Sequence, residues 1–271
     1  MDKTLKTNVG LTEFAGKPLY YQKRGSGNRH LVFVHGLGGT LDYWTPLISK
    51  LSLTDQYTLH LFDLEGHGLS PTGPLSRLSI ESFAADIKSI FNGANITSAT
   101  LFAHSLGCLA ALRFALSNPN LLDKIVLIGP PPSPLPEAGS KGAFARAALV
   151  RSKGMGAVVD AVVEAGTSAT SQKENPVAIA AVRLSLLGQD PESYAKATWA
   201  LASATQKLEV ERLQSKTLIV TGENDKVSPP TLCEGYASRI RGSELVVLKN
   251  VGHWHVFEDV NGVAAAVENF L

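Results

Sequence analysis

Short apolar runs, each leading into a loop of small residues and then into a helical pattern, are the feature that most constrains the fold. The runs hold few polar residues, as do strands that a parallel sheet buries on both faces. Between them, apolar residues recur at helical spacing. Strands that alternate with helices predict an α/β protein with a mostly parallel central sheet and helices on both of its faces. The expected strands are residues 31–34, 57–62, 99–103, 124–128, 216–221 and 244–248, with an edge strand at 18–22.

The middle of the chain has a different pattern. From residue 137 to about 205, helical periodicity is broken by glycine and proline, and no convincing strand occurs. We expect roughly three to five short helices there, in the position of a lid over one edge of the sheet. The predicted organisation is an α/β core of residues 1–134 and 208–271 with a helical cap at 135–207. Core helices are expected at 42–51, 80–91, 108–116 and 256–271.

Composition excludes several classes of protein. With a formal net charge of +1 and 44% hydrophobic residues, the chain has neither a nucleic-acid-binding field nor a disordered composition. Cys108 and Cys233 form no metal-binding or disulfide pattern. The charged amino terminus lacks the apolar core of a signal peptide, and no apolar run has the length of a membrane span. We therefore expect a soluble, cytoplasmic protein that binds neither nucleic acid nor membrane.

Ser105 stands between an expected strand and an expected helix, with Ala103 two residues before it and Gly107 two residues after it. This is the pattern of a nucleophile elbow, a turn so tight that both of those positions need small side chains. Ala103 replaces the usual glycine and adds one methyl group, which we expect the turn to tolerate. The turn would expose the Ser105 hydroxyl and direct the amide of Leu106 toward a developing oxyanion.

A glycine-rich loop, His35-Gly36-Leu37-Gly38-Gly39, follows the strand expected at 31–34. Loops at the carboxyl ends of parallel strands bind ligands in α/β proteins. This loop lacks the lysine and hydroxyl residue of a phosphate-binding loop, so a nucleotide is not expected. We expect it to bring the amide of Leu37 close to a reacting oxygen.

The last two expected strands are each followed by a candidate partner for the serine. Asp225 follows the first of them and His253 the second. The chain order serine, acid, histidine favours a triad in which His253 takes the proton of Ser105 and Asp225 orients the histidine. His255 is the competing base, and Glu223 is the competing acid.

Two other histidines are interpreted as structural. His104 adjoins Ser105, but its side chain should leave the turn in another direction. His67 lies between two glycines in a loop, where packing and hydrogen bonding explain it better than chemistry does.

These motifs together resemble the α/β-hydrolase superfamily with a helical cap, over nearly the whole chain. The resemblance implies a Ser-His-Asp hydrolase that acts without a metal or a cofactor. A serine nucleophile differs from the aspartate of halide and epoxide enzymes with this fold, which argues against both. Residues 151–155 and 194–208 are similar to the 3-oxoadipate enol-lactonase branch. The superfamily motifs are His35-Gly36-x-Gly38-Gly39, Asp63-x-x-Gly66-His67-Gly68-x-Ser70, His104-Ser105-x-Gly107, Gly222-x-x-Asp225-x-Val227-x-Pro229 and Gly252-His253-x-x-x-x-Glu258.

The expected function is hydrolysis of a small carboxylic ester, lactone or enol-lactone through an acyl-enzyme on Ser105. Cleavage of a carbon–carbon bond beside a ketone is an alternative that the same triad supports. A small-molecule receptor on the hydrolase scaffold is another. The sequence specifies neither the substrate nor the oligomeric state.

The enol-lactonase resemblance also implies a carboxylate on the substrate away from the scissile bond, and a buried carboxylate needs a cationic partner. Four cations lie at the start of the cap, and their position near a helix C-terminus is an alternative explanation for them. Among them we expect Arg151 to bind the carboxylate, with Trp199 as an apolar wall. The cations are Lys141, Arg146, Arg151 and Lys153.

Overall fold

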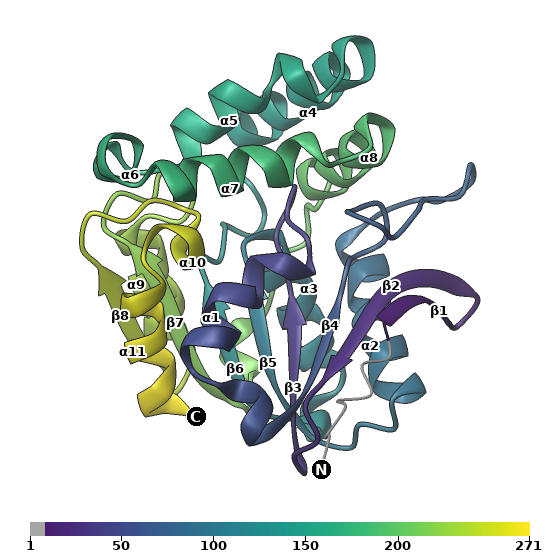
Figure 1. The fold of residues 1–271 in the computed structure, drawn as a ribbon, viewed down its shortest axis with the longest axis vertical. Coiled ribbons are helices and arrows are strands. Elements are labelled where there is room, and N and C mark those ends of the chain that lie inside the picture. The colour runs from purple at the N-terminus through teal and green to yellow at the C-terminus, as the bar shows by residue number, and fades with distance from the viewer. Residues whose placement is uncertain (1–8) are drawn as a thin grey trace, which may run out of the picture.

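The computed structural model describes residues 9–271. Its centre is an eight-stranded sheet with the strand order β1-β2-β4-β3-β5-β6-β7-β8 (Figure 1). The strands from β4 to β8 in that order pair in parallel, whereas β2 pairs antiparallel with both β1 and β4. The predicted α/β class and mostly parallel sheet are therefore confirmed. The strands are β1 (Val9–Phe14), β2 (Lys17–Arg24), β3 (Arg29–Val34), β4 (Tyr57–Phe62), β5 (Ala99–His104), β6 (Leu122–Ile128), β7 (Lys216–Gly222) and β8 (Glu244–Leu248).

The apolar content of each strand follows its place in the sheet. Every residue of β4 is buried, and so are the last four residues of β3, β5 and β6. The edge strands β1 and β8 are largely exposed or half-buried. The strand expected at 18–22 is present as β2, but it is not at the edge of the sheet, because β1 pairs with β2 and takes the outer position. The sequence of β1 is largely exposed and has no continuous apolar run, so it was not predicted as a strand.

Helices cover both faces of the sheet (Figure 1). On one face α2 packs against α3, and on the other α1 packs against α11. The expected final helix is divided at Asp259, whose side chain accepts a hydrogen bond from the amide of Gly262 and caps α11. Helix α9 was not anticipated. The helices are α1 (Thr45–Lys50), α2 (Ile80–Gly93), α3 (Leu106–Ser117), α4 (Glu137–Lys153), α5 (Val159–Gly166), α6 (Ala169–Glu174), α7 (Pro176–Leu187), α8 (Pro191–Ala202), α9 (Pro230–Arg239), α10 (His255–Glu258) and α11 (Val260–Phe270).

Helices α4 to α8 lie together above one end of the sheet (Figure 1). This is the end where β3 and β5 lead into the glycine-rich loop and Ser105. We call residues 137–202, which hold these helices and the loops between them, the cap, and the other described residues the core. The predicted boundaries fall in the two linkers between core and cap, and the division into two units stays a prediction. Helix α4, with 17 residues, is longer than the short helices expected.

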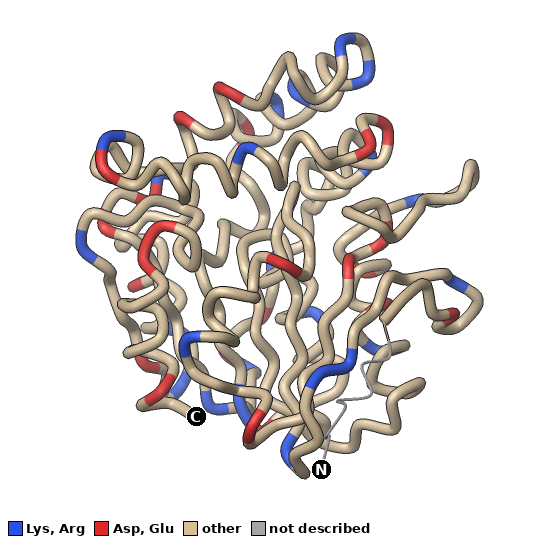
Figure 2. The backbone as a smooth tube through the Cα atoms, in the orientation of Figure 1, with Lys and Arg blue, Asp and Glu red and all other residues tan. Residues whose placement is uncertain are grey.

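Charged residues of both signs are interspersed along the backbone (Figure 2). Among residues 9–271, no helix is long and apolar enough to cross a membrane.

Candidate active site

Ser105 occupies a sharp turn between β5 and α3. Its backbone has φ 50° and ψ −122°, a left-handed conformation that costs a residue with a side chain about 1 to 3 kcal/mol. A Cβ on Gly107 would lie 2.5 Å from the carbonyl oxygen of His35, so only glycine fits there. The methyl group of Ala103 is fully buried within β5. The structure therefore has the predicted elbow geometry, with Ala103 accommodated.

Three side chains from three different loops form one hydrogen-bonded chain. The Oγ of Ser105 lies 2.8 Å from Nε2 of His253, and Nδ1 of His253 lies 2.8 Å from Oδ2 of Asp225. All three residues are buried, with exposed fractions of 8%, 7% and 2% in the order serine, histidine, aspartate. The arrangement can pass a proton from Ser105 to His253 while Asp225 holds the imidazole in one orientation.

Backbone amides hold the carboxylate of Asp225 from behind. Its Oδ1 accepts hydrogen bonds of 2.8 Å from the amides of Val227 and Ser228, which leaves Oδ2 for the histidine. Burial alone would raise the pKa of Asp225, but the imidazoles of His253 and His255 bring that pKa below its ordinary value. Asp225 therefore remains a carboxylate and accepts a hydrogen bond from the Nδ1–H group of His253.

The competing residues, His255 and Glu223, do not take the positions of the base and the acid. His255 is fully buried, and its Nε2 lies 3.3 Å from Oδ2 of Asp225, so it contacts the acid and not the serine. Glu223 is exposed, and its Oε2 accepts a hydrogen bond from the amide of Asn250. The contact between His255 and Asp225 was not anticipated, because the two are 30 residues apart and no motif links them.

His104 and His67 take part in packing and hydrogen bonding. Nε2 of His104 lies 2.8 Å from the carbonyl oxygen of His253, and its ring stacks on Tyr43 at 4.3 Å. Burial lowers the pKa of His104 well below its ordinary value. His67 packs edge-on against His35, and burial lowers its pKa to about 4. Both residues are neutral histidines of the site's walls at pH 7.

The glycine-rich loop after β3 is held by the imidazole of His35. Nε2 of His35 accepts a hydrogen bond from the amide of Leu64, so its Nδ1 carries the proton and donates to the carbonyl oxygen of Gly36 at 2.8 Å. The C=O of Gly36 and the N–H of Leu37 share one planar peptide and point in opposite directions. Fixing that carbonyl therefore fixes the direction of the Leu37 amide.

Leu106 is the first residue of α3, so its amide has no helical carbonyl to bond. The donation of two amides, those of Leu37 and Leu106, to a reacting oxygen stays a prediction.

A buried carboxylate, Asp63, ties the glycine-rich loop to the loop after β4. Its Oδ1 accepts from the amide of Leu41 at 2.7 Å, and its Oδ2 accepts from the amide of Leu69 at 2.9 Å. Burial raises the pKa of Asp63 to about 6 in spite of these bonds. The motif that begins at Asp63 is thus structural support for the loop.

Glu258 supports the loop that carries His253. Its Oε2 accepts from the amides of Gly252 (3.0 Å) and Ser168 (2.8 Å), and its Oε1 accepts from the amide of Trp254 (3.0 Å). Ser168 belongs to the cap, so one carboxylate fixes both neighbours of His253 and attaches the cap to them. The amide of His253 also donates to the carbonyl oxygen of Gly166 in the cap, at 2.8 Å.

Three buried histidines, His104, His253 and His255, have ring nitrogens within 4.8 Å of one another, as metal ligands often do. Both nitrogens of His253 already belong to the triad, and Nε2 of His104 is bonded to a backbone carbonyl. A metal ion bound by all three would have to break these bonds. The donor set therefore fits a hydrogen-bond network better than a metal centre.

The predicted cap residues lie on the solvent-exposed surface of the cap, which we call the outer side of the cap, next to residues 76–78 of the core. Nε and Nη2 of Arg151 donate to Oε2 and Oε1 of Glu192, at 2.7 and 3.0 Å, in an exposed ion pair. Trp199 is half exposed and packs on Phe144 with ring centroids 4.5 Å apart. Arg151, Trp199 and Lys196 line one groove of about 430 Å³, whose described lining holds no triad residue. Their binding roles stay predictions.

The other cap cations differ in their surroundings. Lys141 pairs with Glu137 on the surface. Arg146 is half-buried on α4, close in helical position to the buried Ala143 and Ala147, and its Nε has no hydrogen-bond partner among residues 9–271. Arg146 is therefore a half-buried cap cation with at least one nitrogen that no protein group bonds among residues 9–271.

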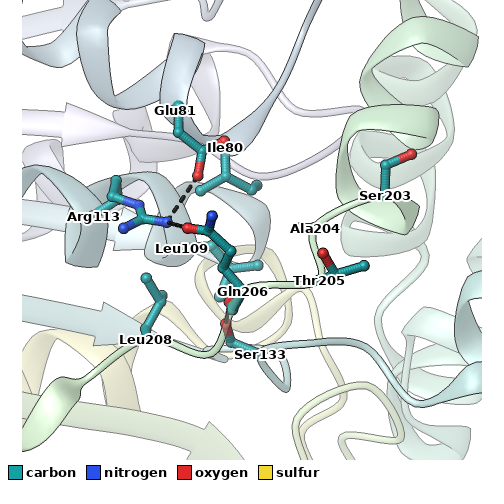
Figure 3. Close-up of a pocket in the computed structure, with 10 residues that line it drawn as sticks. All are labelled: Ile80, Glu81, Leu109, Arg113, Ser133, Ser203, Ala204, Thr205, Gln206 and Leu208. Atoms are coloured by element: carbon teal, nitrogen blue, oxygen red, sulfur yellow. Dashed lines mark hydrogen bonds and ion pairs between the residues drawn. The ribbon is translucent and has the colours of Figure 1, made fainter.

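A second cavity, of about 170 Å³, lies beside the two linkers to the cap (Figure 3). Within it, Arg113 bonds Glu81 and Gln206, and Ser133 of the first linker bonds the carbonyl oxygen of Gln206 in the second. None of the ten residues drawn there belongs to the triad. These contacts hold the linkers together and support no chemistry.

Comparison with known proteins gives the same picture. Residues 29–165 match the family model described as alpha/beta hydrolase fold, and residues 192–271 match one described as TAP-like protein. The pimeloyl-[acyl-carrier protein] methyl ester esterase of Proteus mirabilis is 39% identical, over 42% of this chain and 41% of that protein. The 3-oxoadipate enol-lactonase 2 of Acinetobacter baylyi is 25% identical, over 80% of this chain and 79% of that protein.

Solved structures extend the similarity to nearly the whole chain. A thermophilic esterase from Thermogutta terrifontis has a TM-score of 0.87 at 23% identity, covering 98% of this chain and 97% of that one. The enol-lactonase from Burkholderia xenovorans has a TM-score of 0.85 at 25% identity, covering 96% of this chain and 98% of that one. At these identities the likeness establishes the architecture and leaves the substrate open.

Proposed function

We propose that this chain, which belongs to the α/β-hydrolase fold family, is a serine hydrolase that cleaves the ester bond of a small lactone or enol-lactone. One observation carries the proposal: the unbroken hydrogen-bond chain from Ser105 through His253 to Asp225. A continuous chain of this kind activates a serine hydroxyl, which is a weak nucleophile by itself.

In the first half of the reaction, Oγ of Ser105 attacks the carbonyl carbon of the ester while His253 takes its proton at Nε2. The carbonyl oxygen becomes an oxyanion, which the amides of Leu37 and Leu106 stabilise. The tetrahedral intermediate then collapses. The C–O bond of the ester breaks, and His253 returns the proton to the leaving oxygen.

In the second half, water replaces the leaving group. His253 removes a proton from the water, and the hydroxide attacks the acyl carbon bound to Ser105. Collapse of this intermediate breaks the bond to Oγ, which recovers the proton from His253, and releases the carboxylic acid. Asp225 remains ionised throughout and stabilises the imidazolium that forms at each proton transfer.

The similarity to enol-lactonases supports the substrate class. In a lactone the leaving oxygen stays attached to the acyl group, so the acyl-enzyme holds a single opened chain. The cap contacts the core at the glycine-rich loop and at the loop of His253, which suits a small substrate enclosed beneath it.

The test is a substrate panel of lactones, enol-lactones, short acyl esters and a carbon–carbon substrate with a ketone, each followed by acid release. The wild type should turn over at least one lactone or ester many times. Ser105→Ala should lower kcat by roughly 10⁴-fold or more with an unchanged melting temperature, because it removes the nucleophile and no packing.

Two outcomes would contradict the proposal. Retention of more than about a tenth of the activity by Ser105→Ala would remove the nucleophile assignment. Strong thermal stabilisation by a lactone, with at most one product per protein molecule, would instead favour a receptor on the hydrolase scaffold.

A further inference from the structure

We infer that Gln189, a buried residue of the cap, is a positioning residue that holds the oxyanion loop of the core in its working geometry. The inference rests on the proposed function, since it assigns a role in that reaction. Gln189 lies between α7 and α8 and is 4% exposed. By the oxyanion loop we mean residues 35–40.

One amide group joins the cap to two loops of the core. Nε2 of Gln189 donates to the carbonyl oxygen of Ser185 (2.9 Å) and also to the carbonyl oxygens of Gly38 (3.3 Å) and Gly39 (3.4 Å). Its Oε1 accepts from the amide of Gly68 at 3.2 Å. The two Nε2 hydrogens serve three carbonyls, one inside the cap and two successive carbonyls of the oxyanion loop.

Neighbouring cap residues also contact Gly38. The hydroxyl of Ser185 donates to the carbonyl oxygen of Gly38 at 2.8 Å. Gly38 has a left-handed φ of 74°, and a Cβ there would lie 2.6 Å from Cδ2 of Leu186 and 3.2 Å from the ring of Tyr194. The cap and the oxyanion loop are thus in direct contact at a position where only glycine fits.

These bonds act on the Leu37 amide through one hydrogen bond and one peptide plane. The amide of Gly39 donates to the carbonyl oxygen of Gly36 at 3.0 Å, and that carbonyl shares a peptide plane with the Leu37 N–H. Gln189 holds the carbonyl of Gly39. If Gly39 shifted, its amide would move away from the carbonyl oxygen of Gly36, and the Leu37 N–H would turn with that peptide plane. His35 holds the same turn from the core side.

The consequence is that the cap takes part in stabilising the oxyanion. A donor displaced by about 1 Å can cost up to a hundredfold in rate, and complete loss of one oxyanion donor costs about 10²- to 10³-fold. Removing Gln189 loosens the loop without removing the donor, so we expect a loss of about tenfold in kcat.

The experiment compares Gln189→Met with the wild type. Methionine has nearly the same volume and no hydrogen-bonding amide. Gln172→Met is the matched control, because the Gln172 amide also bonds carbonyl oxygens, those of Glu164 and Thr167, but only within the cap. Ser185→Ala, which removes a single bond to Gly38, is the milder second variant if Gln189→Met folds poorly.

Two readouts are measured on each variant: kcat and KM on the best ester or lactone, and the rate at which an alkyl fluorophosphonate labels Ser105. The label forms a bond from Oγ to phosphorus and expels fluoride, so it needs the triad and the oxyanion donors but no particular substrate. Gln189→Met should lower kcat and labelling by about tenfold with KM changed less than about threefold. Ser185→Ala should lower them by about threefold, and Gln172→Met should change neither.

Equal labelling rates in wild type, Gln189→Met and Ser185→Ala would overturn the positioning role while leaving the proposed function intact. The positioning role would also be overturned if the fall in kcat and labelling of Gln189→Met matched the fall in its folded fraction, measured by circular dichroism. An equal fall in Gln172→Met would overturn it as well. Rapid labelling of a wild type that hydrolyses no ester or lactone would overturn the proposed substrate class, and a tenfold loss of that labelling in Gln189→Met would still support the positioning role. A wild type that is not labelled at Ser105 would overturn both.

Discussion

Polar groups are buried at the carboxyl edge of the sheet and exposed to solvent on the outer side of the cap. At the sheet edge, Ser105, Asp225 and His253 are buried and joined by short hydrogen bonds. On the outer cap, Arg151 and Glu192 form an ion pair in contact with solvent. Buried polar groups are costly when a partner is lost, whereas exposed ion pairs contribute about 0 to 1 kcal/mol. Function and stability should therefore be sensitive at the sheet edge and tolerant on the outer cap.

The largest expected difference is within the acid and histidine pair. Asp225→Asn should lower kcat by roughly 10³- to 10⁴-fold. The asparagine oxygen would stay with the amides of Val227 and Ser228, so an NH₂ group would donate to Nδ1 of His253 where Oδ2 now accepts, and the imidazole would take the wrong tautomer. His253→Ala should cost at least as much, since it removes the base. Steady-state kinetics on the best substrate measures both.

The neighbouring candidates are the controls for that prediction. His255→Ala and Glu223→Gln should cost about tenfold or less in kcat, because His255 contacts only the acid and Glu223 bonds only a backbone amide. A His255 variant as inactive as the His253 variant would show that the roles at the sheet edge are assigned wrongly.

Acid should destabilise the folded protein through its buried histidines. Burial lowers their pKa values, so below pH 6.5 the unfolded chain binds protons that the folded protein does not. The contribution of these histidines to the unfolding free energy is fully present above about pH 6.5 and is lost as the pH falls toward their pKa values in the folded protein. The groups are His35 (about 3), His60 (about 3), His67 (about 4) and His104 (well below its ordinary value).

Two buried carboxyls act in the opposite direction. Burial raises the pKa values of Asp63 and Asp86 to about 6, so these two groups increase the unfolding free energy of the protein as the pH falls from 6 toward 4. Four histidines against two carboxyls leave a net difference of about two protons near pH 5, or roughly 2 to 3 kcal/mol of unfolding free energy per pH unit.

Urea unfolding between pH 7 and 5 measures this slope. His67→Met should reduce it by about one proton, roughly 1.4 kcal/mol per pH unit. An unfolding free energy that is constant over this range would mean that the buried histidines are not kept neutral by the fold.

The smallest expected effects are on the outer cap. If Arg151 binds a substrate carboxylate, it must share its charge with Glu192. Arg151→Ala should then raise KM about tenfold for a lactone with a carboxylate, the loss of one charge-assisted bond, with little change for a neutral lactone of equal size. Glu192→Gln, which frees the guanidinium, should lower KM for the charged lactone by about threefold.

Equal effects on the charged and neutral lactones would remove the anion-binding role of Arg151. The half-buried Arg146, whose Nε lacks a partner among residues 9–271, would then be the cap cation to test next. Arg151→Ala should not change the melting temperature by more than a few degrees, because exposed ion pairs add little to stability.

The residues of the sheet edge could be predicted because each lies directly after a strand whose apolar run is visible in the sequence. Parallel strands bring their carboxyl ends to one edge, so Ser105, Asp225 and His253 had to lie near one another once the strands were recognised. The Leu37 loop was predicted on the same basis. The hairpin strand β1, helix α9 and the break at Asp259 were missed, because exposed edge strands and short helices have weak periodicity.

Other parts of the site depended on distance in space. Nothing in the spacing of Gln189, Ser168 or His255 shows that they contact Gly38, Glu258 and Asp225, since each contact joins segments brought together only by packing. The prediction of Arg151 and Trp199 rested on composition and resemblance, and the pairing of Arg151 with Glu192 depends on how α4 lies against α8.

The sequence by itself therefore determined the α/β class, the elbow at Ser105 and the order of the triad, because these follow from local periodicity and from the geometry of parallel strands. The tertiary structure alone decided that the carboxylate of Glu258 joins the cap to the histidine loop at Ser168, and that Gln189 of the cap holds the oxyanion loop at Gly38. Those contacts are hydrogen bonds between residues far apart in the chain, and a hydrogen bond exists only when folding brings its two atoms to about 3 Å.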